Sequence, residues 1–109
     1  MSQKTARALV YSRSAGVCER CGHQHATEWH HRKNRSQGGK WTAANGLHVC
    51  SQCHRWITEH PAKAATRGYV VRSWQSPLEV PVRLAWHGYV ILDDIGGMTP
   101  ALIDLGGAA

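Results

Sequence analysis

The pattern of apolar and polar positions predicts strands in the second half of the chain. Between residues 80 and 86 apolar side chains occupy every second position, which is the period of a strand with one buried face. A His-Gly pair at 87–88 can turn the chain into the apolar segment 89–92, so a β-hairpin is expected here. Pro81 favours the sheet edge because proline cannot donate to a strand ladder. Residues 69–74 are a further strand candidate.

Two helices are predicted in the first half. Residues 3–14 carry apolar side chains near a spacing of 3.6, and Gly16 is expected to end this helix. Residues 51–60 are also expected to be helical, with Ser51 as the N-cap and Pro61 marking the end.

Between these helices the pattern predicts two short strands, residues 26–31 and 47–49. The second strand follows an Asn-Gly turn at 45–46, and a polar, basic loop at 32–40 separates the two. The expected order from residue 26 onward is therefore strand, loop, strand, helix.

Length and composition fit one small domain. The chain has 109 residues and no Phe, so its core must rest on five Trp, three Tyr and the aliphatic residues. We expect a single domain, 1–109, with a core at 18–61, a C-terminal β segment at 68–96 and a loose tail at 97–109. Its apolar runs are of strand length and no secretory signal is evident, which favours a cytoplasmic protein without a membrane partner.

The net charge of +6 is concentrated in the first 60 residues. That part holds nine Lys or Arg and three Glu, whereas residues 61–109 hold four charges of each sign. A positive excess on one side of a molecule favours a polyanionic partner such as nucleic acid. A merely solubilising surface is the alternative.

Cysteine spacing predicts a structural metal site. Cys18 and Cys21 form one C-x2-C pair, and Cys50 and Cys53 form a second. Two such pairs in a chain without a secretory signal favour a tetrahedral zinc ion over disulfides. A mixed site that recruits His54 is the rival, but it would leave Cys53 unexplained.

Three histidines lie close to the cysteine pairs along the chain. Hydrolysis of a phosphodiester requires a base and a positive charge on the phosphate, and His30, His31 and His54 could supply both a base and metal ligands. Adjacent strand residues point to opposite faces, so His30 and His31 cannot do the same work on a regular strand. The remaining histidines are interpreted as ordinary polar residues: His23, His25, His48, His60 and His87.

A family resemblance rests on these motifs. Glu28-Trp29-His30-His31, then Gly38-Gly39, Asn45, and Cys50-x2-Cys53-His54 follow one another along the chain. Over residues 18–61 the sequence resembles HNH endonucleases with a ββα-metal site, in the branch whose zinc is held by four cysteines. The implied fold is small α+β: a ββα-metal, treble-clef-like core with a four-cysteine zinc site, an N-terminal helix and a C-terminal β-hairpin.

The resemblance implies a role for each motif residue. His31 would be the general base, and His30 and His54 would hold a catalytic divalent ion (Mg²⁺, Mn²⁺, Ni²⁺ or Zn²⁺). Asn45 would brace the loop between the strands and fix His31, or lie close to the metal. The implied activity is divalent-metal-dependent hydrolysis of DNA that leaves a 5′-phosphate.

The chain departs from the family pattern in its later metal ligands. The position four after His54, a further ligand in some relatives, is Thr58, and His60 lies on another helical face. Gly46 replaces the Leu that often follows the family asparagine. The catalytic ion should therefore have two protein ligands, with water and phosphate completing its shell.

DNA contacts are expected from the loop that follows His31. Its basic side chains would contact phosphates without reading sequence: Arg32, Lys33, Arg35 and Lys40. A solvated loop without DNA contacts is the alternative.

The segment after residue 60 is similar to that of small HNH proteins of actinobacterial phages and prophages. Such proteins are often encoded beside packaging genes, which implies genome processing in the cytoplasm of a bacterial host, with terminase proteins as partners. The competing hypothesis is a zinc-stabilised, nucleic-acid-binding packaging accessory whose nuclease site is degenerate.

Overall fold

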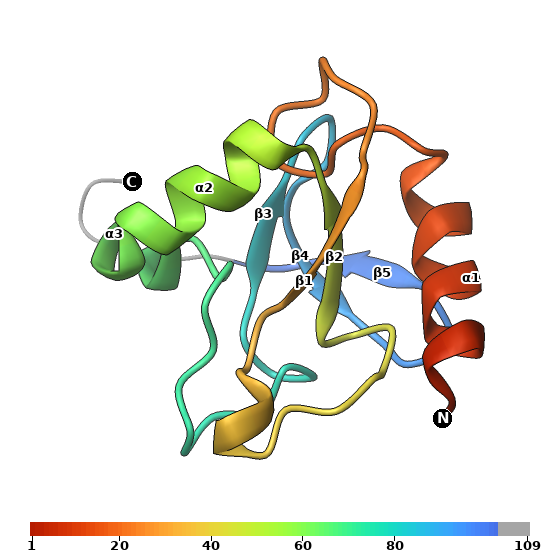
Figure 1. The fold of residues 1–109 in the computed structure, drawn as a ribbon. Helices are drawn as coiled ribbons and strands as arrows, with labels where there is room; N and C mark the ends of the chain where they lie inside the picture. The colour runs from red at the N-terminus through yellow and green to blue at the C-terminus, as the bar shows by residue number, and fades with distance from the viewer. Residues whose placement is uncertain (103–109) are drawn as a thin grey trace.

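The computed structural model describes residues 1–102 and has an α+β architecture (Figure 1). In chain order the elements are α1 (Gln3–Ser14), β1 (Glu28–His31), the short 3-10 helix η1 (Arg35–Gln37), β2 (Gly46–Val49), α2 (Ser51–Glu59), α3 (Pro61–Thr66), β3 (Val82–Leu84), β4 (Gly88–Leu92) and β5 (Met98–Pro100). None of the helices in this part of the chain has the length and apolar character needed to cross a membrane.

The unit β1–β2–α2 is the expected ββα core. β1 and β2 are antiparallel, with a register that runs from Glu28 opposite Val49 to His31 opposite Gly46. α2 follows β2 after a single residue and packs on β1, while α1 packs on the other side of the hairpin (Figure 1). Gly46 is required in this register because any side chain there would collide with the ring of Trp29.

A second, three-stranded antiparallel sheet has the order β3-β4-β5. β3 is an edge strand, as expected from Pro81, and the turn at residues 85–87 joins it to β4. Both sheets and α2 share one buried core, so the described chain folds around a single apolar centre. The core includes Leu47, Val49, Ile57, Tyr69, Val82, Leu84, Val90 and Leu92.

The two predicted helices agree closely with expectation, except in one cap, whereas α3 was not predicted. α1 spans 3–14 as predicted, and Ala15 and Gly16 follow it with positive φ. α2 ends before Pro61, which begins α3. Ser51 is not the N-cap of α2: the cap is Cys50, whose sulfur accepts the Cys53 N–H.

Two expectations for the C-terminal half are wrong in part. Residues 69–74 are not a strand: Tyr69 is buried in the shared core, and the Val71 N–H donates to the Arg32 carbonyl rather than to a partner strand. The tail does not start at residue 97: the Asp93 carboxylate accepts the Gly97 N–H at 2.7 Å and turns the chain into β5, which pairs with β4. The rest of the expected tail, 103–109, lies outside the described residues.

Candidate metal centres and nucleic-acid interface

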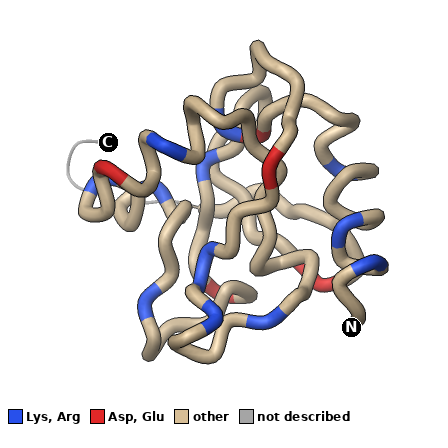
Figure 2. Tube along the Cα trace, in the orientation of Figure 1, with Lys and Arg blue, Asp and Glu red and all other residues tan. Residues whose placement is uncertain are grey.

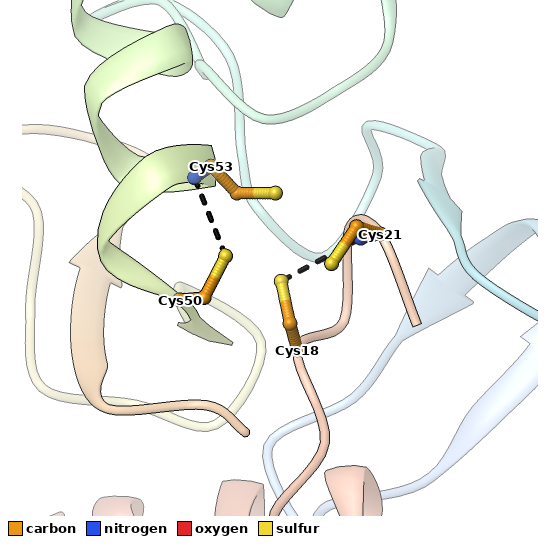
Figure 3. Close-up of side chains that lie close together, drawn as sticks. All are labelled: Cys18, Cys21, Cys50 and Cys53. Carbon is orange, nitrogen blue, oxygen red and sulfur yellow. Dashed lines mark hydrogen bonds between the residues drawn. The ribbon is translucent and has the colours of Figure 1, made fainter. Parts of the chain in front are cut away.

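The four cysteines converge at one point (Figure 3). Cys18 and Cys21 lie on the turn after α1, and Cys50 and Cys53 begin α2. All four sulfur atoms lie within 4.8 Å of one another. Four thiolates around one zinc ion would be about 3.8 Å apart, from a Zn–S bond of about 2.3 Å. The cluster therefore fits a tetrahedral metal ion such as zinc after small adjustments.

The surroundings of the cluster support thiolate ligands. The Cys21 N–H points at Cys18 Sγ at 3.5 Å, and the Cys53 N–H points at Cys50 Sγ at 3.4 Å. Arg20 donates to Cys53 Sγ at 3.2 Å. Burial raises the pKa of Cys53 to about 12, so a bound cation is needed to hold this sulfur as a thiolate at neutral pH. This donor set fits a closed structural site without a position for substrate.

His54 does not join the cysteine cluster. Its Nδ1 donates to Glu28 Oε1 at 2.7 Å, so the mixed site weighed against four cysteines is not the arrangement seen here. Glu28 was not identified as a functional residue from the sequence. The signal was present, because Glu28 and His30 are two apart on one strand and so share a face.

His30 and His54 face each other across β1 and α2. Their ring centroids are 5.2 Å apart. The Nε2–H of His30 donates to the Tyr69 carbonyl at 2.7 Å, so the lone pair on Nδ1 remains free to bind a metal ion. The Glu28 carboxylate likewise leaves Nε2 of His54 free. Metal-binding histidines characteristically donate the N–H of their second ring nitrogen to a carbonyl or carboxylate in this way.

The protonation state of His30 suits metal binding. Burial lowers its pKa to about 4, and the neighbouring charges of His54 and Arg32 act in the same direction. The imidazole is therefore neutral at pH 7, the form in which it ligates a metal.

Few other ligands lie nearby. In residues 1–102 the four cysteines are the only cluster of three or more metal-ligating side chains. Thr58 Oγ1 donates to the His54 carbonyl at 3.1 Å, so it binds its own helix and cannot replace the ligand found there in relatives. Two protein ligands for an ion at His30 and His54 therefore stay a prediction.

His31 lies on the opposite face of β1 from His30. Its ring packs against Trp41, with centroids 4.5 Å apart, and its Nδ1 accepts the indole N–H of Trp29 at 3.1 Å. Burial lowers the pKa of His31. The hydrogen bond from Trp29 fixes the tautomer with the lone pair on Nδ1. In this conformation the structure does not bring His31 to the His30–His54 pair.

Asn45 braces the basic loop. It is buried, its Oδ1 accepts the Lys33 N–H at 2.7 Å, and its Nδ2 donates to the carbonyls of Lys33 and Lys40, each at 3.1 Å. The side chain thus joins both ends of the loop. None of these hydrogen bonds involves a histidine.

Arg32 is not a surface residue, and its expected contact with DNA phosphate is wrong. The residue is 1% exposed, and its guanidinium donates to four backbone carbonyls. These carbonyls belong to Ala44, Gly68, Pro77 and Val80. Burial lowers the pKa of Arg32 to about 9, which still leaves it charged at neutral pH. Arg32 is two residues after His30 and so points to the same buried side of the chain. Strand alternation could therefore have predicted its burial.

The other basic side chains of the loop remain available. Arg35 and Lys40 are exposed, and Lys33 is half-buried with its Nζ donating to the Ser73 carbonyl at 3.2 Å. Figure 2 shows basic positions along the connection between β1 and β2 and on the segment that follows α3. The candidate nucleic-acid interface is therefore Lys33, Arg35 and Lys40, without Arg32.

Comparison with known proteins gives one family match. Residues 18–59 match the family model for HNH endonucleases, which covers both cysteine pairs, the ββα unit and the three motif histidines. This part of the chain is an HNH endonuclease domain with a four-cysteine metal-binding cluster. No curated protein and no solved structure gives a significant match.

Proposed function

We propose that the protein is a divalent-metal-dependent DNA endonuclease that hydrolyses phosphodiester bonds. The observation that carries the proposal is the His30–His54 pair, in which a carbonyl and a carboxylate each hold one imidazole and leave one lone pair free. This pair lies in the segment that matches HNH endonucleases. A bound Mg²⁺, Mn²⁺, Ni²⁺ or Zn²⁺ ion would supply Lewis-acid stabilisation of the phosphate and the leaving oxygen.

In this proposal His31 is the general base. Its Nδ1 is the unprotonated nitrogen, and it would accept the proton of the attacking water once the ring exchanges the Trp29 N–H for that water. Burial lowers the pKa of His31, so the neutral form prevails at pH 7. Catalytic hydrogen bonds often form only with substrate bound. The proposal therefore includes a movement of the His31 side chain toward the His30–His54 pair when DNA binds. Asn45 acts by holding the loop that follows His31.

Zinc in the cysteine cluster is proposed as structural, and the substrate as DNA bound largely through its phosphates. A cytoplasmic role in phage genome processing, with terminase proteins as partners, is supported only by the resemblance of the segment after residue 60. This part is tested separately by purifying the protein from infected cells and asking whether a terminase subunit copurifies.

The packing of His31 favours a second candidate function. A histidine enclosed by Trp29 and Trp41 and turned away from the metal pair suits a degenerate nuclease site. The protein would then be a zinc-stabilised DNA-binding accessory.

Cleavage of supercoiled plasmid discriminates the two functions. The wild type and His31→Ala are compared with Mg²⁺, Mn²⁺, Ni²⁺ or Zn²⁺ supplied in turn. The endonuclease proposal expects metal-dependent nicking by the wild type and none by the variant. DNA binding without nicking in any of the four ions would favour the accessory function instead.

A further inference from the structure

Trp74 is a large aromatic side chain that the fold leaves in solvent. It is 80% exposed and lies on the connection between α3 and β3. Single exposed apolar residues are common and need no explanation by themselves. Trp74 differs because its loop is held in place and lies beside the basic loop of the HNH core.

Arg32 fixes the base of this loop. Its carbonyl accepts the Val71 N–H at 2.8 Å, and its guanidinium donates to the carbonyls of Pro77 and Val80 at 3.0 and 2.7 Å. One buried residue next to His31 thus holds both ends of the segment that presents Trp74, the first end through its backbone carbonyl and the second through its side chain. An aromatic residue on a braced loop loses little conformational freedom on binding.

The charges around Trp74 favour an anionic ligand. Lys33 reaches this loop, with its Nζ at 3.2 Å from the Ser73 carbonyl, and Arg72 is exposed two residues before Trp74. Trp74, Lys33 and Glu79 line an open hollow in the surface. Glu79 is the one acidic side chain that lines it. An exposed aromatic face beside cationic side chains is the arrangement that binds single-stranded nucleic acid, with bases on the ring and phosphates on the cations.

We propose that Trp74 is a stacking platform for an unpaired nucleobase, and that Lys33 and Arg72 contact the flanking phosphates. The protein would therefore prefer DNA that contains a single-stranded segment next to the cleavage point. This inference rests on the proposed function, because it takes DNA as the substrate of the same site.

The platform lies within reach of the metal pair. Trp74 is five residues after Tyr69, whose carbonyl holds His30. Five residues span at most about 18 Å. Phosphates along one strand of a duplex are about 3.4 Å apart along the axis, so one strand could join the two points within about five nucleotides.

Binding to three fluorescein-labelled oligonucleotides tests the inference. They are a short oligothymidine, a backbone of the same length with abasic sites only, and a duplex, titrated with zinc-loaded protein and no added catalytic ion. Trp74→Ala should weaken binding to oligothymidine by about 5- to 100-fold, because stacking on an aromatic ring is lost. Binding to the abasic strand and the salt dependence of binding should not change.

Trp86→Ala is the matched control. Trp86 is 81% exposed, and it lies on the β3–β4 turn at the far end of the molecule from the loop of Trp74 (Figure 1). This variant should bind oligothymidine like the wild type. Thermal unfolding of both variants checks that the fold is retained.

Equal affinity of Trp74→Ala and the wild type for oligothymidine would overturn the inference and assign Trp74 to another contact, such as a protein partner. An equal loss on the abasic strand would also overturn it, since no base is stacked there. A wild type that binds as expected but cleaves no plasmid would refute the proposed function and leave the platform intact.

Discussion

The two candidate metal centres differ in how completely the chain builds them. The cysteine cluster offers four sulfur atoms within 4.8 Å of one another. Two come from the turn that precedes β1 and two from the start of α2. The histidine pair offers two imidazoles, each oriented by one acceptor, and His54 remains half-exposed. A complete, closed site holds its ion as part of the fold, whereas an incomplete, open site leaves coordination positions to water and substrate. In the proposed function, the cysteine cluster would accordingly hold a metal for folding and the histidine pair a metal for chemistry.

The largest effect should come from breaking the cysteine cluster. Cys53→Ser removes one of four ligands, and in small domains metal affinity is itself folding free energy, about 10–16 kcal/mol for zinc-finger peptides. We expect loss of bound zinc and of a cooperative thermal unfolding transition. Zinc analysis and circular dichroism measure both. A variant with full zinc content and native thermal stability would show that the cluster is dispensable.

The next largest effect should separate His31 from His54. His31→Ala should lower the cleavage rate by about 100- to 10,000-fold, the usual contribution of a general base, while metal and DNA affinities stay near those of the wild type. His54→Ala should instead weaken the binding of the catalytic ion. Calorimetric titration with Mn²⁺ beside single-turnover cleavage measures these quantities. If both variants lost metal affinity equally, the proposed division of roles would be wrong.

Glu28 tests the histidine pair alone, because its carboxylate orients His54 and takes no part in the cysteine cluster. Glu28→Ala should raise the metal concentration needed for half-maximal cleavage by about 10- to 100-fold, as is typical for residues that orient a metal ligand. Glu28→Gln keeps an acceptor for the His54 N–H and should lose less. Zinc in the cysteine cluster should be unchanged in both variants. Equal metal requirements in Glu28→Ala and the wild type would mean that the 2.7 Å contact does not position His54.

The sequence predicted those parts of the molecule that depend on local spacing. The two C-x2-C pairs and the strand–loop–strand–helix order are local patterns, and the structure contains both. The opposite orientation of His30 and His31 followed from strand geometry alone, and His30 does face His54 while His31 contacts Trp41.

The failures share a tertiary cause. Arg32 hydrogen-bonds to carbonyls 12 to 48 residues further along the chain, so no local pattern distinguishes it from the exposed basic residues beside it. In the segment that begins at Tyr69, two separate contacts replace a strand ladder: His30 donates to the Tyr69 carbonyl, and the Val71 N–H donates to the Arg32 carbonyl. The position of Trp29 against His31 also depends on Gly46 in the partner strand, which became visible only with the register.

The smallest effect should come from the exposed part of the basic loop. Alanine at Lys33, Arg35 and Lys40 should weaken duplex binding uniformly across sequences. The slope of log affinity against log salt should fall by roughly 2.7, at about 0.9 for each lost phosphate contact. Arg32 is not substituted in this variant, because it is buried and its removal would leave four carbonyls without a donor. Binding titrations at several salt concentrations measure the slope, and zinc content should be unaffected.

The control for this variant comes from α1. Lys4 and Arg7 are exposed on this helix, whereas Arg13 is bound to Glu19 at 2.8 Å and is not free to contact DNA. Lys4→Ala with Arg7→Ala should leave the salt slope near that of the wild type, because α1 lies on the side of the hairpin away from α2 (Figure 1). If the loop variant kept the slope and the α1 variant lost it, DNA would cross the α1 face. The incomplete metal site would then lie away from the bound strand, and the endonuclease proposal would lose its geometric basis.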